Sequence, residues 1–181
     1  MMNDRLRELF LSRAVKFGRF TLASGKESGY YINSKDVLFH PEALHLLGER
    51  LADAVQDAAP QAVGGLEVGA IPLTAAVLLA LHRRGVGCEG FFVRKQPKGH
   101  GSRSLLEGRV APGDRVAVLD DVLTTGGSAV QAVRAVEGVG ATVVRVACVC
   151  DRLQGAREAL AGYDFRPLFT VRDFGIEPDA P

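Results

Sequence analysis

The sequence has 181 residues, of which 47% are hydrophobic and 24% charged, so it can fold as one domain with a substantial core. Its formal net charge of +1 excludes a global field that attracts nucleic acid or a membrane surface, so local groups must hold any phosphate ligand. The N-terminus lacks the apolar core of a secretory signal, and the longest apolar run, residues 71–81, is shorter than the roughly 20 residues that cross a bilayer. Three cysteines without metal-ligand spacing predict free thiols in a reducing, cytoplasmic environment.

The first 40 residues differ in pattern from the rest of the chain. Apolar residues at helical spacing predict a helix over residues 3–17. Residues 20–32 are interrupted by Ser24–Gly25–Lys26, which predicts two short strands around a turn. We expect residues 1–40 to form an N-terminal helix and a small hood over the carboxyl edge of a sheet.

Helices and strands alternate through residues 41–181. The predicted helices cover residues 41–58, 72–84, 128–137 and 153–161, and the predicted strands cover residues 62–66, 90–93, 115–119, 141–150 and 167–171. Strands that are apolar along their length and alternate with helices indicate an α/β fold with a mostly parallel, twisted sheet flanked by helices. We therefore expect a single domain over residues 1–181, with an α/β core that carries a flexible loop at residues 94–104.

One strand leads into a turn with the chemistry of a phosphate site. After the apolar residues 116–119 come Asp120 and Asp121, and then a Thr/Gly/Ser turn opens a helix at Ser128. Glycines let backbone amides approach an anion, and the helix N-terminus adds partial positive charge. The two carboxylates suit sugar hydroxyls and a developing positive charge on the sugar. A generic helix-capping turn would not require this ordered combination.

A cationic loop follows the second strand of the predicted core. Residues 94–103 contain four Lys or Arg and one His without an acid, and Pro and Gly interrupt regular structure. Such a run is often a solvated surface loop. Because this one leaves an apolar strand on the side where the phosphate loop should lie, it suits a lid that closes over pyrophosphate and excludes water.

The phosphate turn closely resembles the motif by which type I phosphoribosyltransferases bind phosphoribosyl pyrophosphate (PRPP). The loop from Arg94 to Gly101 resembles the catalytic loop of the orotate phosphoribosyltransferases, which act as dimers and extend this loop into the partner's site. The resemblance assigns Asp120 and Asp121 to the ribose hydroxyls and residues 124–128 to the 5′-phosphate. Lys98 and His100 then act in catalysis together with the two aspartates. The PRPP-binding residues that it implies are Arg94, Lys95, Lys98, His100, Asp120, Asp121, Val122, Leu123, Thr124, Thr125, Gly126, Gly127 and Ser128.

Two further segments extend the resemblance over nearly the whole chain. Residues 20–31 are similar to the family's hood over the base, in which Tyr30 and Tyr31 either stack on a flat pyrimidine or belong to the core. Arg152 follows a strand where the family places an arginine on the orotate carboxylate, and the guanidinium fork matches a carboxylate. By the same resemblance, Thr124 also contacts orotate.

Two positions depart from the family pattern. Glu27 stands where many members carry a lysine that helps to bind PRPP, so either Lys26 replaces it or the contact is missing. Glu67 to Ala70 occupies a loop where some members have another lysine, and Gly69 offers backbone amides to pyrophosphate instead. These departures concern individual contacts more than the activity.

The implied reaction is attack by orotate N1 on C1 of PRPP, which releases pyrophosphate and gives orotidine 5′-monophosphate. Mg²⁺ would be held mainly by PRPP and water, with no direct protein ligand. One alternative is transfer to another base, against which Arg152 and the cationic loop argue. The other is a PRPP-sensing regulator without catalysis, which has no need of a catalytic lid and usually carries a DNA-binding element that is not evident in this sequence.

Overall fold

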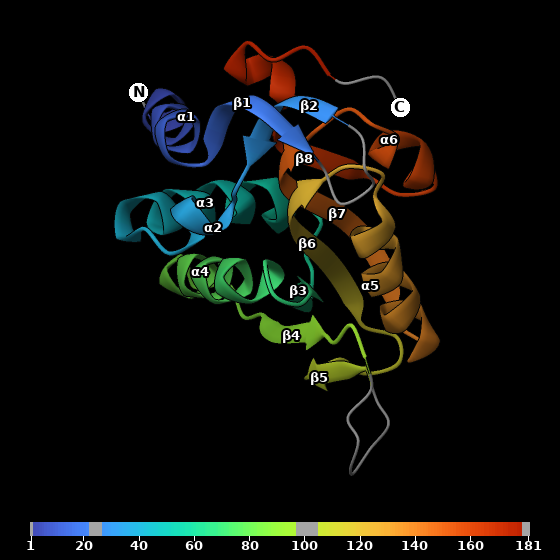
Figure 1. Ribbon diagram of the computed structural model, residues 1–181. Helices are drawn as coiled ribbons and strands as arrows, with labels where there is room; N and C mark the ends of the chain where they lie inside the picture. Colours follow the sequence, from blue (N-terminus) through green and yellow to red (C-terminus); the bar gives the residue numbers. More distant parts are fainter. Residues whose placement is uncertain (1, 22–26, 97–104, 179–181) are drawn as a thin grey trace.

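The computed structural model describes residues 2–21, 27–96 and 105–178, and a six-stranded sheet lies at its centre (Figure 1). The strands lie in the order β5-β4-β3-β6-β7-β8, and all pair in parallel except β5, which runs antiparallel along β4. Their bounds are β3 Ala62–Leu66, β4 Glu89–Val93, β5 Leu106–Gly108, β6 Arg115–Leu123, β7 Thr142–Asp151 and β8 Phe165–Thr170. The expected mostly parallel α/β sheet is confirmed.

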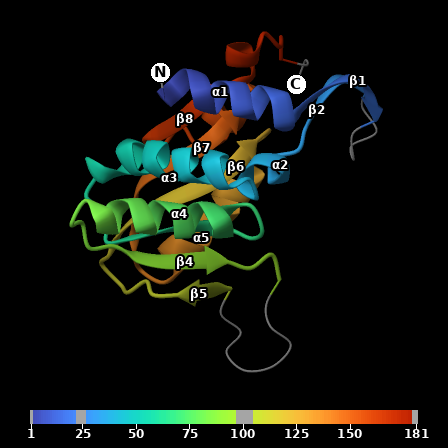
Figure 2. The same cartoon turned by 90° about the vertical axis from the view of Figure 1, so that its left-hand side faces the viewer.

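Helices cover both faces of this sheet (Figures 1 and 2). The helices α3 (Pro41–Gln56) and α4 (Ala70–Arg83) pack on one face, and α5 (Gly127–Gly138) packs on the other. Side chains of β6 and β7 alternate between the two faces, so each face has its own apolar core. No helix in the described part of the chain combines the length and apolarity needed to cross a membrane.

The N-terminal elements pack at the β8 side of the molecule. Helix α1 (Met2–Arg13) contacts α3 and the short 3-10 helix η1 (Val171–Phe174) near the other end of the chain. The ring of Phe10 stacks on Phe174 at 4.8 Å between centroids and lies 6.3 Å from Phe169. The antiparallel strands β1 (Val15–Thr21) and β2 (Glu27–Ile32) form the hood, followed by the four-residue helix α2 (Lys35–Leu38).

The amino edge of the sheet is held by a buried cation. Arg145 on β7 is 5% exposed, donates to the Ala54 carbonyl at 2.6 Å and bonds both Asp57 and Asp164. The carboxylates compensate the cost of burying the guanidinium, and they join α3 to the turn before β8. This end of the sheet is therefore cross-linked away from the edge where ligands bind in such folds.

Several element bounds differ from the sequence-based expectations. The first helix ends at Arg13 instead of residue 17, because the chain turns into the hood strand β1 at Val15. Strand β6 continues to Leu123 through both aspartates, since its pairing with β7 extends to the Leu123–Asp151 pair. The edge strand β5 was not predicted from its three residues, and the helix expected over 153–161 is only α6 (Ala156–Ala159).

Candidate functional site

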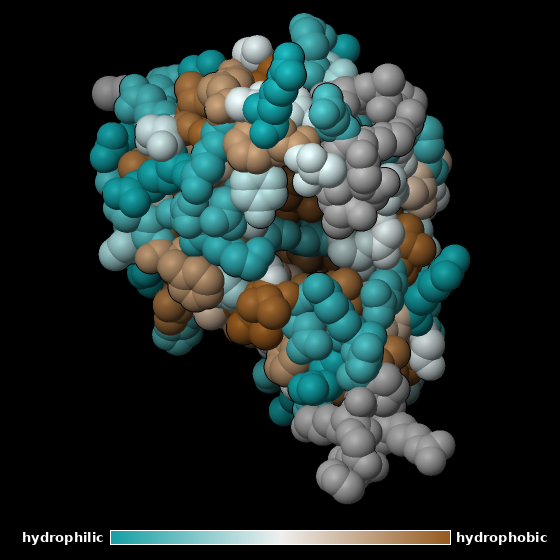
Figure 3. Space-filling model, viewed as in Figure 1, coloured by the Kyte–Doolittle hydropathy of each residue, from teal (hydrophilic) through white to brown (hydrophobic). Residues whose placement is uncertain are grey.

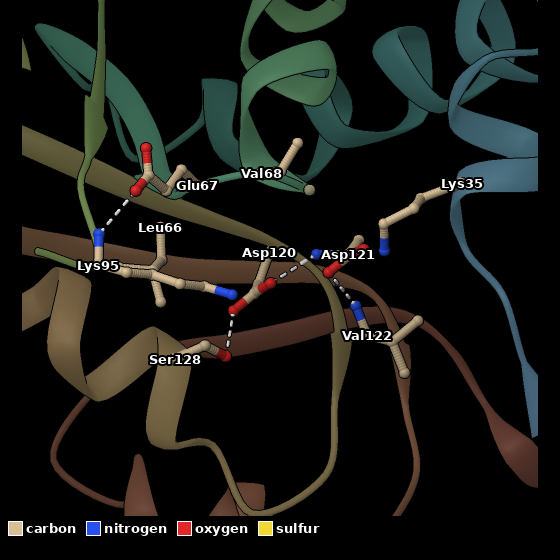
Figure 4. A pocket seen from close by; sticks show the side chains of 10 residues that line it. Lys35, Leu66, Glu67, Val68, Lys95, Asp120, Asp121, Val122 and Ser128 are labelled. Carbon is tan, nitrogen blue, oxygen red and sulfur yellow. Dashed lines mark hydrogen bonds between the residues drawn. The ribbon is translucent and has the colours of Figure 1, made fainter. Parts of the chain in front are cut away.

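A cavity of about 200 Å³ opens at the carboxyl edge of β3 and β6 (Figure 4). The space-filling view shows that this side of the molecule is hollowed (Figure 3). The cavity is bordered by the ends of two parallel strands and by segments before α4, α5 and α2. Its lining residues are Lys35, Leu66, Glu67, Val68, Gly69, Lys95, Asp120, Asp121, Val122 and Ser128. The position matches the ligand-binding edge of open α/β sheets.

The two aspartates are held by a chain of hydrogen bonds. The Ser128 hydroxyl donates to Asp120 Oδ2 at 2.6 Å, and the Asp121 amide donates to Asp120 Oδ1 at 2.8 Å. The Val122 amide donates to Asp121 Oδ1 at 2.9 Å, and the Ser34 hydroxyl donates to Asp121 Oδ2. Both carboxyl groups are therefore fixed in orientation by neighbours on two sides.

Asp120 differs from Asp121 in its exposure to water. It is 4% exposed, and its burial, reinforced by the negative charge of Asp121, raises its pKa from 3.8 to about 7. Asp121 is only half-buried. Near neutral pH the pair therefore carries less than two full negative charges until a cation or a hydroxyl donor approaches.

The predicted phosphate turn lies between β6 and α5. Gly126 has a left-handed φ of +84° directly before α5, a conformation that glycine adopts without strain. Thr124, Thr125 and Gly127 are exposed, so their hydroxyl and amide groups are accessible at the helix N-terminus. Leu123, which was also predicted to bind PRPP, has a fully buried side chain in the core beneath α5.

The segment after β3 forms the opposite wall. Gly69 lies so close to the aspartates that a Cβ atom there would be 2.4 Å from Asp121 Cγ. Only glycine leaves room for this approach of backbone to carboxylate. Glu67 Oε1 accepts a hydrogen bond from the Lys95 amide at 3.0 Å, which ties this wall to the beginning of the cationic loop.

The structure brings part of the cationic loop to the cavity. The Lys95 side chain points toward Asp120 (Figure 4). Arg94 lies outside the cavity lining, and its Nε contacts the Gln96 carbonyl at 3.4 Å. Lys98 and His100 lie outside the described residues, as does Lys26.

Arg152 lies at the same edge of the sheet, directly after β7. It is 8% exposed, and its Nε donates to the Tyr30 hydroxyl at 3.2 Å. Its guanidinium carbon also lies 4.7 Å from the centroid of the Tyr30 ring, within cation–π distance. Tyr30 is buried, whereas Tyr31 is exposed and lies 5.7 Å from the ring of Phe20. Tyr30 therefore belongs to the core and supports Arg152, and Tyr31 is the aromatic residue that faces solvent.

Two residues at the site were missed by the sequence analysis: Lys35 lines the cavity, and Ser34 bonds Asp121 beside it. Ser34 and Lys35 connect the hood to α2, and they contribute a buried hydroxyl and an exposed ammonium group. The recognised hood motif ends at Tyr31. The only available signal was a polar Asn-Ser-Lys sequence directly after a predicted strand, which is common in turns.

An acidic pair and a glycine-rich anion turn at one sheet edge define the site of a phosphoribosyltransferase. The phosphoribosyl transferase domain family matches residues 33–171, and the chain belongs to this family. A relative in Rhodopirellula baltica named orotate phosphoribosyltransferase is 43% identical over 94% of this chain and 92% of its own. Another of the same name, in Thermococcus gammatolerans, is 42% identical over 94% of this chain and 90% of its own.

Solved structures agree with the sequence relatives. The orotate phosphoribosyltransferase of Mycobacterium tuberculosis H37Rv in complex with Fe(III) dicitrate superimposes with a TM-score of 0.87 and 39% identity, covering 97% of this chain and 100% of its own. The same enzyme in complex with PRPP has a TM-score of 0.83 and 36% identity, with 97% and 100% coverage. Within the wider phosphoribosyltransferase family, all of these relatives are orotate phosphoribosyltransferases.

Proposed function

We propose that this protein transfers the phosphoribosyl group of PRPP to orotate, in the biosynthesis of pyrimidines and UMP. The bond from C1 of ribose to the pyrophosphate oxygen breaks, and a bond from C1 to orotate N1 forms. The observation that carries the proposal is the Asp120–Asp121 pair, which shares one cavity with Ser128 at the α5 N-terminus. Arg152, on the neighbouring strand end, adds a guanidinium suited to the orotate carboxylate.

Each part of the edge has a role in this reaction. Residues 124–128 bind the 5′-phosphate through hydroxyls and amides, and Thr124 also reaches the base. Asp120 and Asp121 accept hydrogen bonds from the ribose hydroxyls and stabilise positive charge as the C1 bond breaks. Lys98 and His100 neutralise the leaving pyrophosphate, together with Lys95 and Arg94.

Magnesium is the metal that this chemistry implies, and it supplies charge neutralisation of pyrophosphate when bound. Within the described ranges, no three His, Cys, Asp or Glu side chains are grouped so as to hold a metal ion. Asp120 and Asp121 line an open cavity of about 200 Å³, where magnesium would be held mainly by PRPP and water, with no direct protein ligand. This fits an ion that keeps several waters and takes most of its ligands from PRPP.

We also propose a cytoplasmic homodimer with shared sites. Ile71 and Leu79 on α4 expose 40% and 61% of their surface, beside a mainly apolar hollow of about 260 Å³ between α4 and the β4–β5 edge. A second copy would cover this surface and receive the cationic loop that begins at the end of β4. The apolar face therefore favours a partner on the side of the molecule that carries β4, the strand from which the cationic loop begins.

The shared site can be tested by mixing two inactive variants, Lys98→Ala and Asp121→Asn. Refolding a mixture should give about half mixed dimers, each with one site free of both changes, and recover roughly a quarter of wild-type activity. A lid that acts within its own subunit leaves one defect in every site. Mixed dimers that are confirmed by mass but show no recovery would therefore exclude sharing.

A single assay separates the proposed activity from its alternatives. Purified protein is incubated with PRPP, Mg²⁺ and, in turn, orotate, uracil, adenine, guanine or hypoxanthine, and nucleotide formation is followed. We expect a nucleotide to form with orotate and with none of the other four bases. Product with another base would assign a different phosphoribosyltransferase, and PRPP binding without any product would assign a sensing role.

A further inference from the structure

The cavity that holds the aspartates is lined by more acidic than basic side chains, although its proposed ligand is an anion. Its lining includes three carboxyl side chains, Glu67, Asp120 and Asp121, and two cations, Lys35 and Lys95. PRPP is a polyanion, so carboxylates in the wall oppose its binding unless cations offset them. The net charge of the cavity lining, and with it the affinity for an anion, therefore depends strongly on each lysine.

Lys35 approaches the cavity from a direction that no other cation in the lining uses. It begins α2 and extends toward Asp121, whereas Lys95 approaches Asp120 from the opposite side (Figure 4). Among the residues that the structure describes, no carboxylate forms an ion pair with Lys35. Its ammonium group is exposed and directed at the acidic pair, so it is free to contact a ligand anion.

The preceding residue fixes this arrangement. Ser34 is 5% exposed and donates its hydroxyl hydrogen bond to Asp121 Oδ2. The backbone that carries Lys35 is thereby attached to the carboxylate beside which the sugar would lie. A four-carbon side chain rooted at this point can reach the cavity without any movement of α2.

The geometry of the edge separates the two phosphate-bearing ends of PRPP. The exposed hydroxyls and amides of Thr124, Thr125 and Gly127 suit the 5′-phosphate, and the aspartates suit the ribose between the two ends. The pyrophosphate then lies toward the wall formed by residues 66–69 and the two lysines. We propose that Lys35 binds the pyrophosphate group of PRPP there, which rests on the proposed function of the site.

The acidic residues of the cavity lining increase the contribution that Lys35 should make to pyrophosphate binding. Glu67 contributes a negative charge to the pyrophosphate wall, beside Asp120 and Asp121. With every group of the lining ionised, three carboxylates and two lysines leave a net charge of −1, and removal of Lys35 makes it −2. The loss should therefore weaken binding of the more highly charged end of the substrate.

The experiment compares Lys35→Gln and Lys35→Arg with the control Lys16→Gln. Lys16 is an exposed lysine on β1 that pairs with Asp36 at 3.8 Å and lies outside the cavity lining. Calorimetric titrations at fixed Mg²⁺ use four probes: PRPP, pyrophosphate alone, ribose 5-phosphate and orotidine 5′-monophosphate. Circular dichroism and thermal unfolding check that each variant is folded.

We expect Lys35→Gln to bind PRPP and pyrophosphate about 10- to 100-fold more weakly, as a lost charged hydrogen bond predicts. Ribose 5-phosphate and orotidine 5′-monophosphate should bind as they do to wild type. Lys35→Arg should recover most of the pyrophosphate affinity, and Lys16→Gln should match wild type throughout.

Unchanged pyrophosphate binding in folded Lys35→Gln would overturn the inference. So would a loss confined to orotidine 5′-monophosphate, which would assign Lys35 to the base. The proposed function is judged separately, by transfer to orotate in the wild-type protein. If the wild type binds pyrophosphate but does not use orotate, the proposed function is refuted. The titrations with pyrophosphate would still decide whether Lys35 binds that group.

Discussion

Replacing Asp120 with asparagine should stabilise the protein above pH 7 while it impairs the site. The side chain is almost completely buried, and its pKa in the folded state is raised from 3.8 to about 7 by burial and then by the charge of Asp121. Because the folded state holds this proton more tightly than the unfolded state, the stability of the wild type falls as pH rises from about 4 to 7. Asparagine cannot ionise, so the variant avoids this loss.

The size of the effect follows from the pKa. A rise from 3.8 to about 7, at about 1.4 kcal/mol for each pKa unit, corresponds to an upper limit near 4 kcal/mol. Asparagine keeps one oxygen to accept from the Asp121 amide, and its amide group can donate to the Ser128 hydroxyl in place of the present bond. Imperfect geometry of that exchanged bond should reduce the gain to about 2–4 kcal/mol above pH 7.

Urea unfolding of the ligand-free protein at pH 5, 6, 7 and 8 measures this difference. We expect the free energies of unfolding of wild type and Asp120→Asn to be closest at pH 5. The advantage of Asp120→Asn should then grow as the pH rises to about 7. Asp121→Asn removes the second cause of the raised pKa, so its own stability should vary less with pH than that of wild type. An advantage equal at pH 5 and pH 8, or a variant less stable than wild type at pH 8, would refute the argument.

Three further substitutions test other parts of the molecule. Asp121→Asn should lower transfer at least about tenfold in a folded protein, and near-normal turnover would contradict its contact with the sugar. Arg152→Ala should weaken the use of orotate by roughly 1.5–3 kcal/mol and leave PRPP affinity nearly unchanged, whereas loss of PRPP binding alone would assign it to the other ligand. Arg145→Ala should lower the free energy of unfolding by about 2 kcal/mol, because it removes the buried guanidinium that joins Asp57 and Asp164 and leaves Arg166 as their partner at a partly exposed edge. Its kcat should match wild type at temperatures where it is folded, and a large fall would contradict a purely structural role.

Local patterns predicted the parts of the site that are contiguous in sequence. The strand, acids and glycine turn from residue 116 to 128 each impose their own geometry, and the alternation of elements placed Arg152 at the same edge. The Ser34–Asp121 bond joins residues 87 positions apart, and no local property of either residue specifies that pairing. Lys35 was missed because a lysine after a strand is usually solvated, and only the tertiary fold places this one at the cavity. The bounds of β6 depended on pairing with β7, which is also a tertiary effect.

The stack of Phe10 on Phe174 has a consequence for the order in which the molecule is completed during synthesis. Phe10 on α1 leaves the ribosome long before its aromatic partners Phe169 and Phe174, which lie far along the chain. A nascent chain that ends before β8 cannot bury the ring of Phe10 in this way, and it lacks the final strand of the sheet. Such distant contacts slow folding, so the core around Phe10 stays incomplete until β8 and η1 have been synthesised. Premature termination should therefore yield fragments that chaperones or proteases recognise by the exposed apolar face of α1.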